Sequence, residues 1–166
     1  MVETVKRQVL EDHLLQPEHT LNLVVVDVRG RDFVGGHIFG ALHIPHTAFR
    51  PEKLHALLAG KGTPQLVVFH CMYSRLRAPV CAEVYLDFLG KQKTGDCRVA
   101  ILEGGFSGWL ESYVRHPKRE QLVQDFDSAQ WSCIGGAWEH ITDCPWAAPK
   151  AQGSADLMAM LRTAQG

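Results

Sequence analysis

The sequence lacks an excess of charge of either sign. Its 166 residues carry 17 Lys+Arg against 18 Asp+Glu, for a formal net charge of −1. Proteins that bind nucleic acid or anionic membrane surfaces usually show a basic excess. We therefore expect neither nucleic acid nor a membrane as a partner.

Long apolar runs are also missing. The longest ones, such as residues 23–26, last only a few residues, whereas a membrane-spanning helix needs about 20. The opening residues, MVETVKRQVLEDH, lack the apolar core of a secretory signal. These absences predict a cytoplasmic location, or a nuclear one.

Cysteine is sparse and odd in number. Secreted disulfide scaffolds carry a dense, even set of cysteines, so this chain fits a reducing compartment better. A chain of this length buries roughly 70% of the surface that its unfolded form exposes, and it needs no disulfide or metal to hold a core. The five cysteines are Cys71, Cys81, Cys97, Cys133 and Cys144.

Buried strands and helices alternate along the first two thirds of the chain. Nearly continuous apolar runs predict strands at 21–28, 66–69 and 98–102, with a shorter one at 41–45. Helical spacing predicts helices over 4–16, 51–62 and about 75–89, ended by Gly90, and a short one around Trp109. This alternation predicts an α/β domain with a mainly parallel sheet flanked by helices.

The predicted domain covers residues 1–115. Residues 116–166 hold three tryptophans, two cysteines and a final short helix at 154–163. They are too few for a separate core. We predict that they form a C-terminal extension that packs on the domain or is partly flexible.

The most informative stretch is VVFHCMYSRLRAP, residues 67–79. A buried strand ends, Cys71 follows, and a helix begins a few residues later. In parallel α/β sheets, ligands bind at the carboxyl ends of the strands. The free N–H groups and the positive dipole at a helix N-terminus attract anions. The loop is therefore expected to curl around a tetrahedral oxyanion.

Cys71 and Arg77 are the candidate catalytic pair of this stretch. The planar guanidinium of Arg77 can bind two oxygens of an anion at once. The positive surroundings favour the thiolate form of Cys71, which is placed for in-line attack on the central atom. A buried cysteine before an ordinary helix is the simpler alternative, but strand, His-Cys, five residues, arginine and helix occur here together. The anion-binding residues between the pair are Met72, Tyr73, Ser74, Arg75 and Leu76.

Three segments in this order resemble a known family. VVVDVRGRDFVGGHIFGALHIP resembles the rhodanese-homology segment, His-Cys-x5-Arg resembles the active loop of the phosphatase branch of that fold, and ILEGGFSGW resembles its last strand–Gly-Gly–helix unit. Together they span about residues 5–112. The Ser-x-x-Arg-Ala-Pro stretch is similar to small eukaryotic arsenate/antimonate reductases, which are related to the M-phase inducer dual-specificity phosphatases.

The resemblance implies a single rhodanese-like domain with Cys71 as nucleophile, Arg77 as oxyanion clamp and the amides of residues 72–76 as anion ligands. It implies an enzyme that reduces arsenate or antimonate with an external thiol such as glutathione or glutaredoxin, or that hydrolyses phosphoesters as a tyrosine or dual-specificity type phosphatase. Its partners would be a small oxyanion or a phosphorylated substrate, together with the thiol donor. No bound cofactor is implied.

Departures from the family pattern favour reduction over hydrolysis. M-phase inducer phosphatases carry acidic residues where this chain has Met72 and Leu76, so no loop carboxylate can protonate a leaving alkoxide. They also carry a protective cysteine where this chain has Val28. Arg75 adds a second positive charge. Sulfurtransferases of this fold have a shorter Cys-x4-Arg loop; sulfur transfer and a non-catalytic binding module remain the alternatives.

The remaining polar candidates are given supporting roles. Asp27 and Arg29 end a buried strand beside the site and are expected to hold the adjoining loops. His70 is expected to orient the active loop, and Cys81 to fill the core rather than resolve an adduct.

We expect no metal site. Two groups of metal-ligand types stand out, but the first belongs to the Gly-His-Ile turn and the second lacks a fourth ligand. The groups are His37, His43 and His46, and Cys133, His140 and Cys144.

Overall fold

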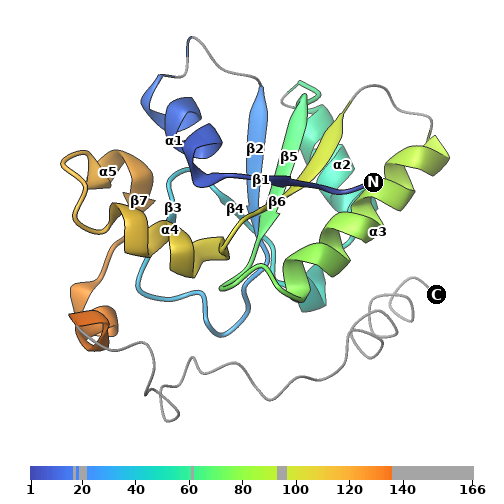
Figure 1. The fold of residues 1–166 in the computed structure, drawn as a ribbon. Coiled ribbons are helices and arrows are strands. Elements are labelled where there is room, and N and C mark those ends of the chain that lie inside the picture. Colours follow the sequence, from blue (N-terminus) through green and yellow to red (C-terminus); the bar gives the residue numbers. More distant parts are fainter. Residues whose placement is uncertain (17, 19–21, 61, 93–96, 136–166) are drawn as a thin grey trace.

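A five-stranded parallel sheet forms the centre of the molecule. The structure is a computed structural model that describes residues 1–16, 18, 22–60, 62–92 and 97–135, the last four by their backbone alone. The strand order is β1-β6-β5-β2-β4 (Figure 1). Its strands are β1 (Glu3–Val5), β2 (Leu23–Asp27), β4 (Leu42–His43), β5 (Leu66–His70) and β6 (Arg98–Leu102).

Helices cover both faces of this sheet (Figure 1). One face is covered by α1 (Arg7–Leu15), α4 (Gly105–Tyr113) and α5 (Arg119–Leu122), and the other by α2 (Pro51–Ala59) and α3 (Arg77–Gln92). In the described part of the chain, 3₁₀ helices form at η2 (His46–Ala48), between β4 and α2, and at η3 (Ser128–Gly135), after the last strand. None of the helices in the described ranges is long and apolar enough to cross a membrane. The predicted α/β architecture with a parallel sheet is confirmed.

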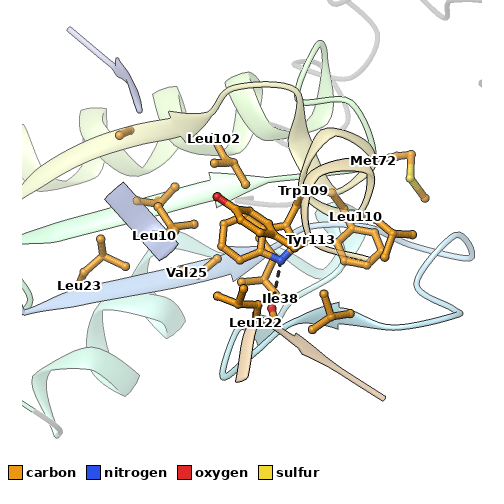
Figure 2. Packing of buried hydrophobic residues seen from close by; sticks show 14 of the residues in the cluster. Leu10, Leu23, Val25, Ile38, Met72, Leu102, Trp109, Leu110, Tyr113 and Leu122 are labelled. Carbon is orange, nitrogen blue, oxygen red and sulfur yellow. Dashed lines mark hydrogen bonds between the residues drawn. The ribbon is translucent and has the colours of Figure 1, made fainter. Parts of the chain in front are cut away.

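Each face of the sheet has its own hydrophobic core. Figure 2 shows the core under α1 and α4, where the fully buried Trp109 packs among side chains such as Leu10 and Leu102. The indole N–H of Trp109 donates to the carbonyl of Leu122 at 3.0 Å. On the other face, residues such as Leu54 pack against β5 and α3. A sheet covered on both sides explains why its central strands are almost continuously apolar.

The predicted helix over 4–16 was wrong at its start. Residues 3–5 form the edge strand β1, which pairs with β6 in the register Glu3↔Ala100 to Val5↔Leu102. A strand of three residues, with exposed Glu3 and Thr4, has too few side chains to show an alternating pattern. The prediction that Gly90 ends α3 was also wrong, because the helix continues to Gln92.

Residues beyond 115 contribute to the core. Leu122 and Val123 are buried in it, and β7 (Val123–Gln124) pairs antiparallel with β3 (His37–Ile38). Trp131 packs near Phe106 and donates its indole N–H to the carbonyl of Gly35 at 2.6 Å. The predicted helix at 154–163 and the other two tail tryptophans lie outside the described residues.

We predict that Leu122→Ala lowers the free energy of unfolding by about 2–5 kcal/mol, because it opens a cavity in a fully buried position. Leu57→Ala is the matched control; this side chain is 44% exposed and its loss should cost about 0.5 kcal/mol. Urea unfolding of both variants measures the difference. Equal losses would show that residues past 115 do not share the core.

Candidate active site

The predicted active loop lies at the carboxyl end of the central strand. β5 ends at His70, Cys71 follows, and α3 begins at Arg77. The neighbouring strand β2 ends at the same level, with Asp27 opposite His70 in the register. Parallel strands bring these ends together, so the predicted supporting residues meet the predicted loop.

The loop between Cys71 and Arg77 is anchored in both hydrophobic cores. Cys71 and Met72 are each 3% exposed, but Cys71 packs into the core under α3, whereas Met72 packs into the core under α4 (Figure 2). Tyr73 is partly buried against the same core as Met72. Arg75 is exposed.

The backbone of this loop leaves donors available. Within the described residues, the N–H groups of Met72, Ser74, Arg75 and Leu76 donate to no carbonyl or side chain. Ser74 has a φ of 53°, in the left-handed region that a serine rarely adopts. Its hydroxyl oxygen is buried without a hydrogen-bond partner in the described part of the chain. A curved run of unpaired amides can receive an anion.

The start of α4 fixes the loop from behind. The N–H of Phe106 donates to the carbonyl of Cys71 at 2.9 Å, and that of Ser107 donates to the carbonyl of Met72 at 2.8 Å. Gly105 lies so close that a Cβ there would stand 2.5 Å from the Cys71 oxygen. Its φ of +59° also suits glycine. The second glycine of the Gly104–Gly105 turn is therefore required by this contact.

A buried charged network lies below the loop. Asp27, Arg29 and His70 are each fully buried. The Nε–H of Arg29 donates to both carboxylate oxygens of Asp27, at 3.0 and 2.9 Å. His70 Nε2 lies 3.5 Å from Asp27 Oδ2 without making a hydrogen bond. Burial raises the pKa of Asp27, but the neighbouring His70 and Arg29 side chains hold it below its usual value.

Arg29 also shapes the next loop, residues 28–36. Its terminal N–H groups donate to the carbonyls of Asp32 at 3.3 Å and Gly36 at 2.9 Å. Its guanidinium carbon lies 4.0 Å from the ring centre of Phe106 and 4.9 Å from that of Phe33, two cation–π contacts. Arg29 therefore holds the loop through its terminal N–H groups and Phe33. Its Nε–H binds Asp27 on β2, and its guanidinium also contacts Phe106 on α4.

Asp32 is the site residue that sequence reasoning missed. Its two carboxylate oxygens accept hydrogen bonds from the two terminal nitrogens of Arg77, each at 2.6 Å. Burial raises the pKa of Asp32, but the hydrogen bonds and charge of Arg77 outweigh it and hold the pKa below its usual value. The available signal was position: Asp32 follows β2, whose carboxyl end adjoins that of β5.

His46 lies close to this pair. Burial and the charge of Arg77 lower the pKa of His46, and its Nδ1 is buried without a partner in the described residues. His37 and His43, the other two histidines of the candidate metal group, have different partners. His43 stacks on Phe33 with ring centres 3.5 Å apart, and Nδ1 of His37 lies 3.9 Å from Oδ2 of Asp125. Across the described ranges, no three metal-ligand side chains are grouped to hold an ion.

The remaining predicted cysteines fall in different places. Cys81 is fully buried, and burial raises its pKa to about 12, as suits a core thiol. Cys97 lines a cavity of about 290 Å³ together with Thr63 and Tyr85. Cys97 directly precedes β6 and Thr63 precedes β5, so this cavity lies at the amino ends of the strands, away from Cys71. The side chain of Cys133, and all of His140 and Cys144, lie outside the described residues.

We predict that Gly105→Ala lowers the free energy of unfolding by about 2–4 kcal/mol, because it adds a steric clash with the loop to the cost of a positive φ. Gly40→Ala is the control. Gly40 has a similar φ of +70° but no atom within 4 Å of the added Cβ, so about 1–2 kcal/mol is expected. Chemical unfolding compares them, and indistinguishable losses would refute the contact.

A pH dependence follows from His70. Burial lowers its pKa from 6.5, so the unfolded chain takes up a proton that the folded state refuses. Above about pH 6.5, His70 therefore costs the folded state no stability. Below it, the free energy of unfolding falls by up to about 1.4 kcal/mol per pH unit because of this group. His70→Gln should therefore give a shallower loss between about pH 6.5 and 5.5. A His70→Gln variant that kept the wild-type slope over this pH range would contradict the assignment.

Comparison with known proteins shows which family the chain belongs to. A family model described as Rhodanese-like domain matches residues 10–112. The CDC25-like phosphatase YCH1 of Saccharomyces cerevisiae is 39% identical over 113 residues, which cover 60% of this chain and 76% of that protein. Arsenate reductase 2.2 of Oryza sativa subsp. japonica is 37% identical over 90 residues, covering 52% of this chain and 68% of the relative.

Solved structures show the same likeness. Ygr203w, a yeast protein tyrosine phosphatase of the Rhodanese family, superposes with a TM-score of 0.68 at 30% identity, covering 78% of this chain and 96% of that one. The As-Sb reductase of Leishmania major superposes with a TM-score of 0.64 at 24% identity, covering 70% of this chain and 82% of that one. This is a likeness of fold. The chain therefore belongs to the rhodanese-like domain family and is related, within it, to Cdc25-like phosphatases and arsenate reductases.

Proposed function

We propose that this protein is a cysteine-dependent oxyanion enzyme that reduces arsenate or antimonate with an external thiol and also attacks phosphoesters. One observation carries the proposal. Cys71 ends the central strand, Arg77 begins the next helix, and described amides of the loop between them are unpaired. This arrangement supports a thiolate beneath a bound tetrahedral anion, with the amides and the guanidinium stabilising the charge that develops during attack.

The proposed reduction proceeds in three balanced steps. The Cys71 thiolate bonds to arsenic(V), and one arsenic–oxygen bond breaks to release water with protons that arsenate itself carries. A thiol such as glutathione then attacks Cys71 Sγ; the sulfur–arsenic bond breaks, and its electron pair leaves with arsenite. A second thiol reduces the mixed disulfide and frees Cys71. Overall, arsenate and two thiols give arsenite, one disulfide and one water.

Phosphoester hydrolysis by the same loop would need a leaving group that departs readily. The thiolate would displace an alkoxide from phosphorus, and water would then hydrolyse the sulfur–phosphorus bond. Met72 and Leu76 bring no carboxyl group to the loop, and Asp32 is held ionised by Arg77. A proton donor for a poor leaving group is thus not supplied by these residues, so aryl phosphates are favoured over alkyl ones.

We predict that Cys71→Ser abolishes arsenate reduction and aryl phosphate hydrolysis, because a serine hydroxyl stays protonated near neutral pH. Arg77→Lys should lose about 2–4 kcal/mol of transition-state stabilisation with both substrates, since lysine has no planar fork. The assay runs arsenate with glutathione and glutaredoxin, an aryl phosphate, and thiosulfate with cyanide side by side.

Cys97→Ser is the matched control. It removes a thiol at the opposite edge of the sheet and should leave every rate unchanged. Rapid turnover of thiosulfate, with none of arsenate or the aryl phosphate, would replace the proposal with sulfur transfer. Failure of the wild-type protein with all three substrates would favour a non-catalytic binding module.

A further inference from the structure

The Arg77–Asp32 pair uses only one edge of the guanidinium. The pair is end-on: Nη1 of Arg77 donates to Oδ1 of Asp32, and Nη2 donates to Oδ2, each at 2.6 Å. A guanidinium has five N–H donors in a rigid plane. The edge formed by Nε–H and the adjacent terminal N–H has no partner in the described part of the chain. Arg77 can therefore hold Asp32 and a second anion at once.

Asp32 is also held by groups other than Arg77. One carboxylate oxygen accepts the N–H of Gly30 at 3.0 Å, and the carbonyl of Asp32 accepts an N–H of Arg29 at 3.3 Å. Arg29 is itself fully buried and bound to Asp27. Asp32 is thus fixed through the buried Asp27–Arg29 pair. Arg77, in contrast, has a long side chain and is the first residue of α3.

Orientation is the contribution that such a carboxylate can make. A free arginine side chain loses conformational entropy when it is fixed in one rotamer. Asp32 fixes Arg77 before any ligand arrives. A donor that is already aligned stabilises a transition state without reorganising during the reaction.

We propose that Asp32 is a positioning residue, which holds the guanidinium of Arg77 end-on so that its Nε edge faces the bound oxyanion. This inference rests on the proposed function of the same loop. It predicts that loss of Asp32 lowers the turnover rate but leaves anion binding nearly unchanged. Without Asp32, Arg77 keeps its charge and still attracts the anion, and a neighbouring negative charge is removed. The alignment needed in the transition state is lost.

The test uses the full chain with Asp32→Asn, which keeps an oxygen for the Gly30 N–H. We expect kcat for arsenate and for an aryl phosphate to fall about 10- to 100-fold, as for a displaced catalytic group. The dissociation constant of inorganic phosphate, measured by calorimetry, should change by less than about threefold. Asp87→Asn, the same change at an exposed position on α3, should match the wild-type protein in both measurements.

A double-mutant cycle shows whether Asp32 acts through Arg77. In an Arg77→Lys background, Asp32→Asn should lower kcat by less than about threefold further, because the group that it positions is gone. Losses that multiply would overturn the inference. An unchanged kcat in Asp32→Asn would also overturn it. If phosphate then bound more tightly to this variant, Asp32 would act only as an anion that competes for Arg77.

If Asp32→Asn does not fold, Asp32→Glu provides the test, because it keeps the charge but moves the carboxylate by one methylene. Its kcat should fall while phosphate binding is kept. An unchanged kcat in this variant would overturn the inference. If the wild-type protein neither binds phosphate nor turns over either substrate, the proposed function fails first, and Asp32 then has no oxyanion site to serve.

Discussion

The buried ion pair between Asp27 and Arg29 is the interaction on which the site depends. A charge without contact with water is costly unless it is paired and its remaining hydrogen-bonding capacity is used. Arg29 meets both conditions, through Asp27 and through two carbonyls of the 28–36 loop. The same contacts give that loop its shape, and the loop delivers Asp32 to Arg77. A single buried cation thus connects the end of β2 to the start of α3.

The active loop is stiffened because it crosses from one core to the other. Cys71 packs on the α3 side of the sheet and Met72 on the α4 side, so the chain cannot slide without disturbing one of the two. Ser74 then takes a strained backbone conformation between these anchors and the helix. Strain of this kind persists only where the surrounding structure holds it, and it is common where a backbone is shaped for a ligand.

Sequence patterns predicted the elements whose side chains carry strong signals. The apolar runs of β2, β5 and β6, and the proline that begins α2, appear where they were expected. β1, β3 and β7 were missed, because strands of two or three residues gain their stability from partners far away in the chain. Spacing predicted Cys71, Arg77 and the loop between them as the active site, and this assignment stays a prediction. The pairing of Arg77 with Asp32 joins residues 45 positions apart, which no local pattern contains.

The contact between α4 and the active loop determines which way the loop's peptide groups point. In a trans peptide the carbonyl and the following N–H point in opposite directions. The carbonyls of Cys71 and Met72 are bound by the first amides of α4. The N–H groups of Met72 and Tyr73 must then point away from α4. Two backbone N–H groups at the start of α4 therefore set the polarity of the loop: these loop carbonyls face α4, and the N–H groups that follow them face away from it.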